Sequence, residues 1–148
     1  MSRELLEELP EQVCLSLLYA NNVGRIAVVV DGCPEVMPVN YRVVDLAGAP
    51  AVVVRTRRGN VIDSSAINVA FEIDGIDPAH RSGWSVLVKG ELHHVDPPLA
   101  DMLRDRLESL SWLPEGNDSW LAIQQLQITG RRLHAPEAQW AFHIRGYL

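Results

Sequence analysis

Residues 51–60 read Ala-Val-Val-Val-Arg-Thr-Arg-Arg-Gly-Asn, and this stretch is the starting point for predicting both the fold and the site. The β-branched run from Val52 to Val54 predicts a buried strand, and the arginines after it mark where that strand reaches solvent. Gly59 permits a turn that a side chain would strain, and residues 61–66 predict the start of a short helix. A strand end, a hydroxyl group, guanidinium groups and a helix N-terminus together favour a phosphate site. The alternative is a solvated basic loop.

Length and charge limit the kinds of protein to consider. The chain has 148 residues, which suits one domain with a sizeable core, so a single domain over residues 1–148 is expected. The formal net charge is −6, and this argues against nucleic-acid binding, which needs a broad basic face. On such an acidic chain, the basic cluster at residues 55–58 would attract a small anion rather than a polymer.

Cysteine usage and the N-terminus predict the compartment. Cys14 and Cys33 are the two cysteines and have no Cys-x-x-Cys spacing, which predicts free thiols in a reducing cytoplasm. The first residues are acidic and amphipathic, unlike a signal peptide. No apolar run approaches the roughly 20 residues that span a bilayer. A cytoplasmic protein without membrane contact is therefore expected.

Hydrophobic periodicity predicts helices at the N-terminus and one later helix, with strands between and after them. The predicted helices cover Ser2–Leu9, Pro10–Ala20 and Leu99–Leu110. The predicted strands cover Gly24–Val30, Glu35–Val44, Val52–Val54, Asn68–Asp74, Trp84–Val95, Trp120–Gly130 and Gln139–Ile144. Loops are expected over Gly75–Gly83 and Pro114–Asp118.

Single residues refine this pattern. Asn21 is expected to end the second helix in left-handed backbone, and Asp31-Gly32 is a hairpin turn signal. Pro38 inside a strand predicts an edge, a bulge or broken pairing, and Gly90 predicts a bulge or a barrel bend. The apolar side of the last predicted helix is expected to contain Leu99, Met102, Leu103, Leu107 and Leu110.

The strand count and order predict the fold class. Six to seven strands in hairpin order, interrupted by one helix after the fifth strand, predict an antiparallel β-barrel. The chain would then be dominated by β-structure, an α+β protein with helices at its N-terminus. The alternating βαβ rhythm of a parallel sheet is absent from the sequence.

Five motifs occur along the chain in a fixed order, and their order and spacing resemble a known family. They are Gly24-Arg-Ile-Ala-Val-Val-Val, Pro38-Val-Asn-Tyr41, Val54-Arg-Thr56 with Gly59, Val69-Ala-Phe-Glu-Ile-Asp74 and Gly83-Trp-Ser-Val-Leu-Val-Lys-Gly90. The chain is similar to the pyridoxamine 5'-phosphate oxidase-like family of FMN-binding split-barrel proteins, above all to its short, nitroimidazole-resistance-like bacterial members. The resemblance covers about residues 10–128. It implies a six-stranded split barrel, a homodimer and one FMN in each of two clefts at the dimer interface.

The resemblance also implies which residues hold the cofactor. Arg55 and Thr56 are expected to contact the FMN phosphate, and Trp84 and Ser85 are expected to reach the flavin held mainly by the other subunit. The backbone expected to face the isoalloxazine ring is that of Pro38, Val39, Asn40 and Tyr41.

The chain departs from the family pattern at two places. Many members carry a lysine after the glycine, but Asn60-Val61-Ile62 follows Gly59 here, so Arg57 or Arg58 is expected to substitute. The longer oxidases carry an Arg-x-His motif followed by an acidic–basic pair, and Arg132-Leu133-His134 resembles a fragment of it. Because Ala135 follows that fragment, efficient oxidation of pyridoxamine 5'-phosphate is not expected.

Two functional hypotheses follow. The first is an FMN-dependent oxidoreductase, a reductase or oxidase that acts on a small organic molecule. NADH or NADPH is a candidate electron donor. No catalytic side chain is assigned, because the flavin supplies the chemistry. The second is a binding protein without turnover that holds flavin, deazaflavin or haem.

Three further expectations concern single residues. Tyr41 and Trp84 are predicted to form an aromatic wall beside the flavin ring. A metal site is not expected, since the histidines lack ligand spacing. A homodimer is expected to cover an apolar strand face made of Trp84, Val86 and Val88.

Overall fold

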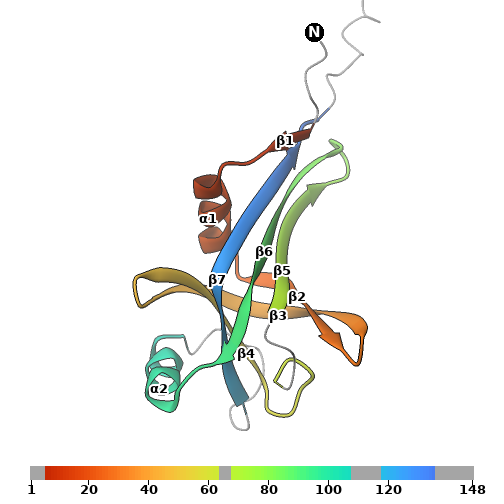
Figure 1. Ribbon diagram of the computed structural model, residues 1–148. Helices are drawn as coiled ribbons and strands as arrows, with labels where there is room; N and C mark the ends of the chain where they lie inside the picture. The colour runs from red at the N-terminus through yellow and green to blue at the C-terminus, as the bar shows by residue number, and fades with distance from the viewer. Residues whose placement is uncertain (1–5, 64–67, 108–117, 136–148) are drawn as a thin grey trace, which may run out of the picture.

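The computed structural model describes residues 6–63, 68–107 and 118–135. Its strands form one antiparallel sheet in the order β1-β7-β4-β3-β2-β5-β6, and a further pairing of β6 with β7 closes the last six into a barrel (Figure 1). This confirms the predicted antiparallel split barrel. The strands are β1 (Leu6–Glu8), β2 (Val23–Val30), β3 (Cys33–Leu46), β4 (Ala49–Arg57), β5 (Asn68–Asp77), β6 (Ser82–His94) and β7 (Asp118–Leu133).

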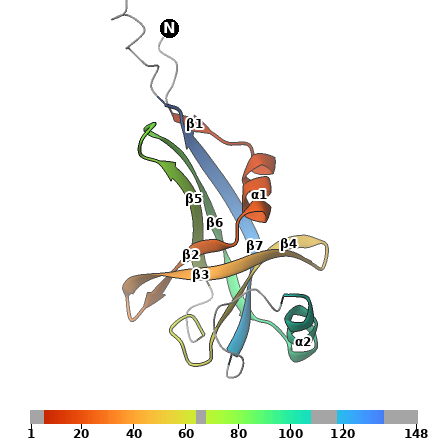
Figure 2. The same cartoon turned by 180° about the vertical axis from the view of Figure 1, so that it is seen from behind.

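Two helices accompany the barrel, α1 (Glu11–Ala20) and α2 (Pro97–Arg106). In both views α1 lies beside β7, and α2 lies near the opposite end of that strand (Figures 1 and 2). Leu18 of α1 and Leu103 of α2 are the apolar side chains that each helix buries most completely, at 0% and 1% exposed. Among the described residues, neither helix is long and apolar enough to cross a membrane.

The valine run of β4 is buried on both of its faces. Val52 and Val54 belong to the core inside the barrel, whereas Val53 packs with Leu103 and Trp120 under α2. All three valines are fully buried. Burying a side chain of this size contributes about 1.5–3 kcal/mol to the stability of the fold. Because both faces of β4 are covered, apolar residues are favoured at every position, and the sequence shows a continuous apolar run instead of an alternating one.

Tight turns join β2 to β3 and β3 to β4. Asp31 and Gly32 both have positive φ, as do Ala47 and Gly48. Two-residue hairpin turns need such backbone because it matches the twist of the flanking strands. The Asp31-Gly32 turn signal is therefore confirmed.

β7 closes the barrel by changing partners along its length. The first part of β7 pairs with β4, beginning with Asp118 opposite Arg57. The last residues of β7 pair with β1, which is the edge strand of the sheet. The other side of β7 pairs with β6, where the register shifts between Lys89 and Glu91. The predicted bulge at Gly90 is confirmed, and a Cβ at that position would lie 2.6 Å from the carbonyl oxygen of Gln124.

The N-terminal part of the chain differs from the prediction. Leu6–Glu8 form β1 rather than part of a helix, because they pair with the end of β7. α1 begins after Pro10, as predicted, but Asn21 ends it in extended backbone with φ −115°. The Asn21 side-chain amide instead donates a hydrogen bond of 2.8 Å to the carbonyl oxygen of Leu17.

Several strand and helix limits also need correction. β5 and β6 extend to Asp77 and Ser82, so the predicted Gly75–Gly83 loop is mostly sheet, and Asp118 belongs to β7 rather than to a loop. Residues 61–63 form turns rather than a helix. Met102 lies 42% exposed instead of on the buried side of α2. The predicted Gln139–Ile144 strand and Leu110 lie outside the described residues.

Candidate functional site

The split of the barrel lies between β3 and β4. These strands pair from Leu46 and Ala49 as far as Tyr41 and Val54, where their ladder ends. Beyond that point, residues 38–40 pair only with β2, and residues 55–57 pair only with β7. β3 continues across the molecule while β4 turns toward the far end of β7 (Figure 1). The two segments predicted to hold the ring and the phosphate therefore border the same split.

The structure separates the side chains of the predicted ring segment into two environments. Pro38 and Asn40 lie on the outer side of β3. Pro38 pairs with β2 only, and a strand position that pairs on one side tolerates proline, which has no backbone N–H to donate. Val39 packs against the core inside the barrel. The outer side chains and the backbone of this segment are the groups it can offer to a ligand.

Tyr41 does not form a wall beside a ligand, which corrects the prediction of an aromatic wall. Its side chain is fully buried, meets Phe71 edge to face at 4.9 Å, and donates a hydrogen bond of 2.7 Å to the carbonyl oxygen of Leu18. Burial raises the pKa of the Tyr41 hydroxyl. Tyr41 thus joins α1 to the barrel, and only its backbone remains available at the split.

Arg55 and Thr56, the predicted phosphate contacts, are buried at 8% and 4% exposed. The Nε–H of Arg55 donates to Oδ2 of Asp118, and the guanidinium lies 5.9 Å from the ring centroid of Trp120. A guanidinium paired in this way holds β4 against β7. The exposed cations next to it are Arg57 and Arg58.

The loop after β4 is held by its own polar groups. The N–H of Gly59 donates to Oδ2 of Asp63 at 2.8 Å, and the N–H of Ile62 donates to Oδ1 of Asn60 at 3.1 Å. Gly59 has a φ of +80°, so its backbone takes the left-handed form that glycine tolerates best. Turns rather than a helix N-terminus therefore present the backbone N–H groups of this loop.

Trp84 lies at the other end of the barrel from this loop. It pairs with Gly75 on β5 and with Arg132 on β7, and a Cβ on Gly75 would lie 2.5 Å from the indole Nε1. A recess of about 450 Å³ is lined by Trp84, Arg132 and His134, among others. The structure thus places the Arg132–His134 fragment beside the predicted flavin-edge residue.

The strand face named for dimer formation is inside the barrel. Val86 and Val88 are fully buried, and Trp84 packs against the same core. Alternation along β6 turns Ser85, Leu87 and Lys89 outward instead. A dimer would need other residues than the predicted ones.

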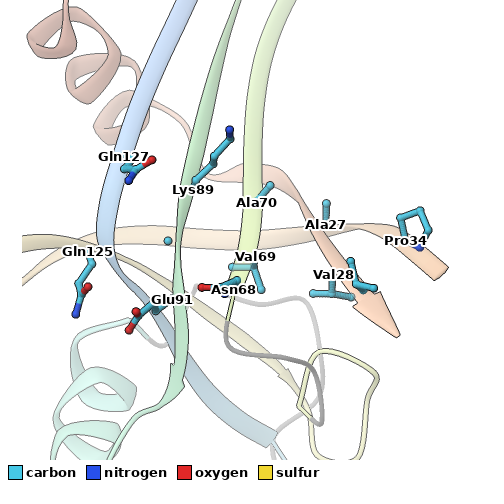
Figure 3. Close-up of a pocket in the computed structure, with 12 residues that line it drawn as sticks. Ala27, Val28, Pro34, Asn68, Val69, Ala70, Lys89, Glu91, Gln125 and Gln127 are labelled. Carbon is cyan, nitrogen blue, oxygen red and sulfur yellow. The ribbon is translucent and has the colours of Figure 1, made fainter. Parts of the chain in front are cut away.

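The outer face of the sheet carries a hollow that the sequence did not reveal. It has a volume of about 500 Å³ and crosses β2, β5, β6 and β7 (Figure 3). Small residues lie together at the hollow because of the strand register: Ala27 is opposite Ala70, and Gly90 follows Lys89, the partner of Ala70 on β6. Only knowledge of the strand register reveals this grouping, because its members are far apart in the sequence.

Charged groups lie next to this hollow on the same face. Arg25 pairs with Glu72 and Asp74, each at 3.1 Å. The pKa of Glu72 is raised, chiefly by burial and then by the hydrogen bond and negative charge of Asp74. None of the residues predicted to bind a cofactor lines the hollow, and Arg58 lines a separate cavity of about 210 Å³ beside α2.

The fold and the split define the chain as a split-barrel protein, and comparison gives its family. Residues 10–132 match the family described as pyridoxamine 5'-phosphate oxidase, so the chain belongs to that family. This confirms the resemblance seen in the sequence motifs.

Relatives in other organisms support this assignment. Uncharacterized protein Rv0080 of Mycobacterium tuberculosis is 33% identical over 90% of this chain and 89% of its own. The FAD binding protein of Mycobacterium smegmatis is 34% identical, with a TM-score of 0.72 over 86% of this chain and 98% of that chain. A proposed 5-nitroimidazole antibiotic resistance protein of Bacteroides thetaiotaomicron shares the fold, with 12% identity and a TM-score of 0.59 over 86% and 88% of the two chains.

Proposed function

We propose that this chain binds a flavin nucleotide at the split between β3 and β4 and uses it to oxidise or reduce a small organic molecule. The observation that carries the proposal is the likeness to the Mycobacterium smegmatis protein, which binds FAD and is 34% identical to this chain. The same split is bordered by the segments 38–40 and 55–57, which the sequence assigned to the ring and the phosphate.

Each segment has a role that its chemistry supports. The backbone of residues 38–40 presents hydrogen-bonding groups where the ladder to β4 has ended. Arg57 and Arg58 are exposed guanidinium groups, which bind phosphate well because they donate in a planar fork. When bound, the flavin supplies the electron transfer, so the chain needs to orient it, exclude water and hold its charges.

The identity of the nucleotide is the finer part of the proposal. FMN remains our first candidate, because the basic cluster stands at a strand end where a terminal phosphate would be held. FAD is the second candidate, because the related Mycobacterium smegmatis protein binds it. Titration with FMN and FAD under the same conditions distinguishes the two, since the preferred nucleotide will bind more tightly than the other.

A homodimer is part of the same proposal. The face that carries the hollow also exposes large apolar side chains at Val29 (54%), Val36 (66%) and Leu87 (36%). Large apolar side chains exposed on one face favour an interface there. We propose that a second copy covers this face, in place of the buried face named from the sequence. Sedimentation at micromolar concentration checks this point, and a stable monomer near 16.5 kDa would contradict it.

Turnover separates an enzyme from a binding protein. The experiment mixes the flavin-loaded protein with NADH or NADPH and a small organic acceptor, and follows the flavin absorbance and the loss of the nicotinamide. Catalytic reduction of the acceptor supports an oxidoreductase. Bound flavin with no turnover would instead support the alternative of a non-catalytic flavin protein, and preferential binding of deazaflavin or haem would change the cofactor.

A further inference from the structure

The loop after β4 already contains an anion. The carboxylate of Asp63 accepts the N–H of Gly59 through Oδ2 at 2.8 Å, and its side chain is only 14% exposed. Its other oxygen, Oδ1, is buried, with Nε2 of His94 3.6 Å away. A carboxylate in this position is an internal counterpart of the phosphate that the loop was predicted to bind.

Cationic and polar groups surround the carboxylate. The Nε2 atom of His94 lies 3.6 Å from Oδ1 of Asp63 and 3.1 Å from its backbone carbonyl oxygen, and Ser119 Oγ lies 3.4 Å from His94 Nδ1. The pKa of Asp63 is lowered, first by the Gly59 hydrogen bond, then by Ser119, and further by the charges of His94 and Arg58. The carboxylate is therefore ionised at neutral pH.

A flavin phosphate at this loop would need the same partners. Arg58 and the Gly59 N–H are a cation and a backbone donor of this loop, and Asp63 already accepts from the donor and is influenced by the charge of the cation. Two anions near one cation repel each other, which weakens the binding of the second. The effect is largest where solvent is partly excluded, as it is around this side chain.

We infer that Asp63 is a selectivity residue, an internal anion that competes with the flavin phosphate for Gly59 and Arg58 and so weakens FMN binding relative to riboflavin. This inference rests on the proposed flavin function and deepens it, because it names the group that sets the preference for the phosphate end of the ligand.

A purely structural role is the competing explanation, and the chain offers a matched control. In the β3–β4 turn, Oδ1 of Asp45 accepts the N–H of Gly48 at 2.9 Å, which is the same kind of turn hydrogen bond as that of Asp63. Asp45 lies at the far end of the β3–β4 hairpin from the split. If Asp63 only shapes a turn, the two aspartates should behave alike toward flavins.

The experiment compares Asp63→Asn with Asp45→Asn and the unaltered protein. Asparagine keeps the acceptor for Gly59 but removes the charge. Dissociation constants for FMN and riboflavin are measured from the quenching of flavin fluorescence, and thermal melting checks that each variant is folded. We expect Asp63→Asn to tighten FMN binding about tenfold or more, to leave riboflavin within about twofold, and Asp45→Asn to change neither.

The outcomes separate the inference from the function on which it rests. If riboflavin binds but FMN affinity is unchanged or weaker in Asp63→Asn, the inference is overturned and flavin binding stands. If neither FMN nor riboflavin binds to any of the proteins, the inference is overturned; if FAD does not bind either, the proposed function is overturned with it. Asp63→Ser serves as the second variant should the asparagine protein not fold, and the same tightening for FMN is expected of it.

Discussion

Arg55 on β4 and Asp118 at the start of β7 form an ion pair whose two side chains are 6% and 10% exposed, with the guanidinium Nε donating to the carboxylate. The two residues stand on neighbouring strands: Asp118 lies two residues before Trp120, which is the direct ladder partner of Arg55. The pair fastens the end of β4 to β7 at the border of the split. The arginine nearest the strand therefore stabilises the barrel, and the exposed arginines after it remain for a ligand.

Replacing Arg55 with alanine should destabilise the fold. The change leaves the carboxylate of Asp118 buried without its partner, and breaking a buried ion pair from one side typically costs about 3 kcal/mol or more. Urea unfolding measures the loss. Arg57→Ala is the control, because Arg57 is exposed and its loss should change stability by no more than about 0.5 kcal/mol. Equal small effects of both substitutions would contradict a structural role for the Arg55–Asp118 pair.

Tyr41→Phe should lower the free energy of unfolding by about 1–1.5 kcal/mol, because it removes the hydrogen bond to the Leu18 carbonyl while keeping the ring. Tyr19→Phe is the matched control, since Tyr19 is 60% exposed on the same helix that Tyr41 contacts. The measurement is urea unfolding of the three proteins side by side. A stable Tyr41→Phe protein would show that the buried hydroxyl contributes little to docking α1.

The pH dependence of the same residue gives a separate prediction. Burial raises the pKa of Tyr41 in the folded protein above its unfolded value of about 10. The folded state then holds its proton more tightly, so this contribution to stability is complete below about pH 10 and is lost as the pH rises toward the folded pKa. Ultraviolet titration should show one tyrosine that ionises only on unfolding. A free, reversible ionisation of all tyrosines near pH 10 would contradict the buried position.

Gly75→Ala should disturb Trp84. A Cβ at this position would lie 2.5 Å from the indole Nε1 and 2.7 Å from Cε2, so the ring would have to move. Overpacking of this kind typically costs about 1–3 kcal/mol. The change should appear in the near-ultraviolet circular dichroism and in thermal melting. The cost should shrink in a Trp84→Leu background, and an undiminished cost there would mean that the glycine is needed for another reason.

Sequence patterns predicted the barrel because its hairpins are local. The Asp31-Gly32 turn and the alternation of β2 depend on neighbours within a few residues. The first strand was misread as a helix because Leu6–Glu8 gain their structure from the end of β7, about 125 residues away. A three-residue segment has no periodicity of its own with which to signal such a partner.

The site was predicted in part, for similar reasons. The basic cluster and the segment 38–41 border one split, and their contact with a flavin stays a prediction. Charge patterns could not show that Asp118 neutralises Arg55 or that Asp63 caps the loop, because both contacts depend on tertiary packing. Tyr41 was misplaced since alternation tells which residues share a face but not which face is inside.

If Arg58 binds the FMN phosphate as proposed, Arg58→Ala should weaken FMN binding by about 1.5–3 kcal/mol, the range for hydrogen bonds to charged groups, because it removes an exposed guanidinium. Riboflavin affinity should remain within about twofold, since riboflavin lacks the phosphate. Arg42→Ala is a control for general charge loss, because Arg42 lies on β3 and donates to a backbone carbonyl there. An equal loss of both flavins would show that Arg58 does not contact a phosphate.

The most direct test of flavin binding at the split is a titration of the purified protein with FMN, FAD and riboflavin, followed by flavin absorbance and fluorescence. We predict saturable binding of at least one flavin nucleotide, with fluorescence quenching and one site per chain. Replacing residues at the split should weaken it: Asn40→Arg, which places a bulky cation beside the backbone of residues 38–40, should abolish binding while thermal melting shows a folded protein. No saturable binding of any flavin, or full binding in the Asn40→Arg protein, would contradict a flavin site at the split.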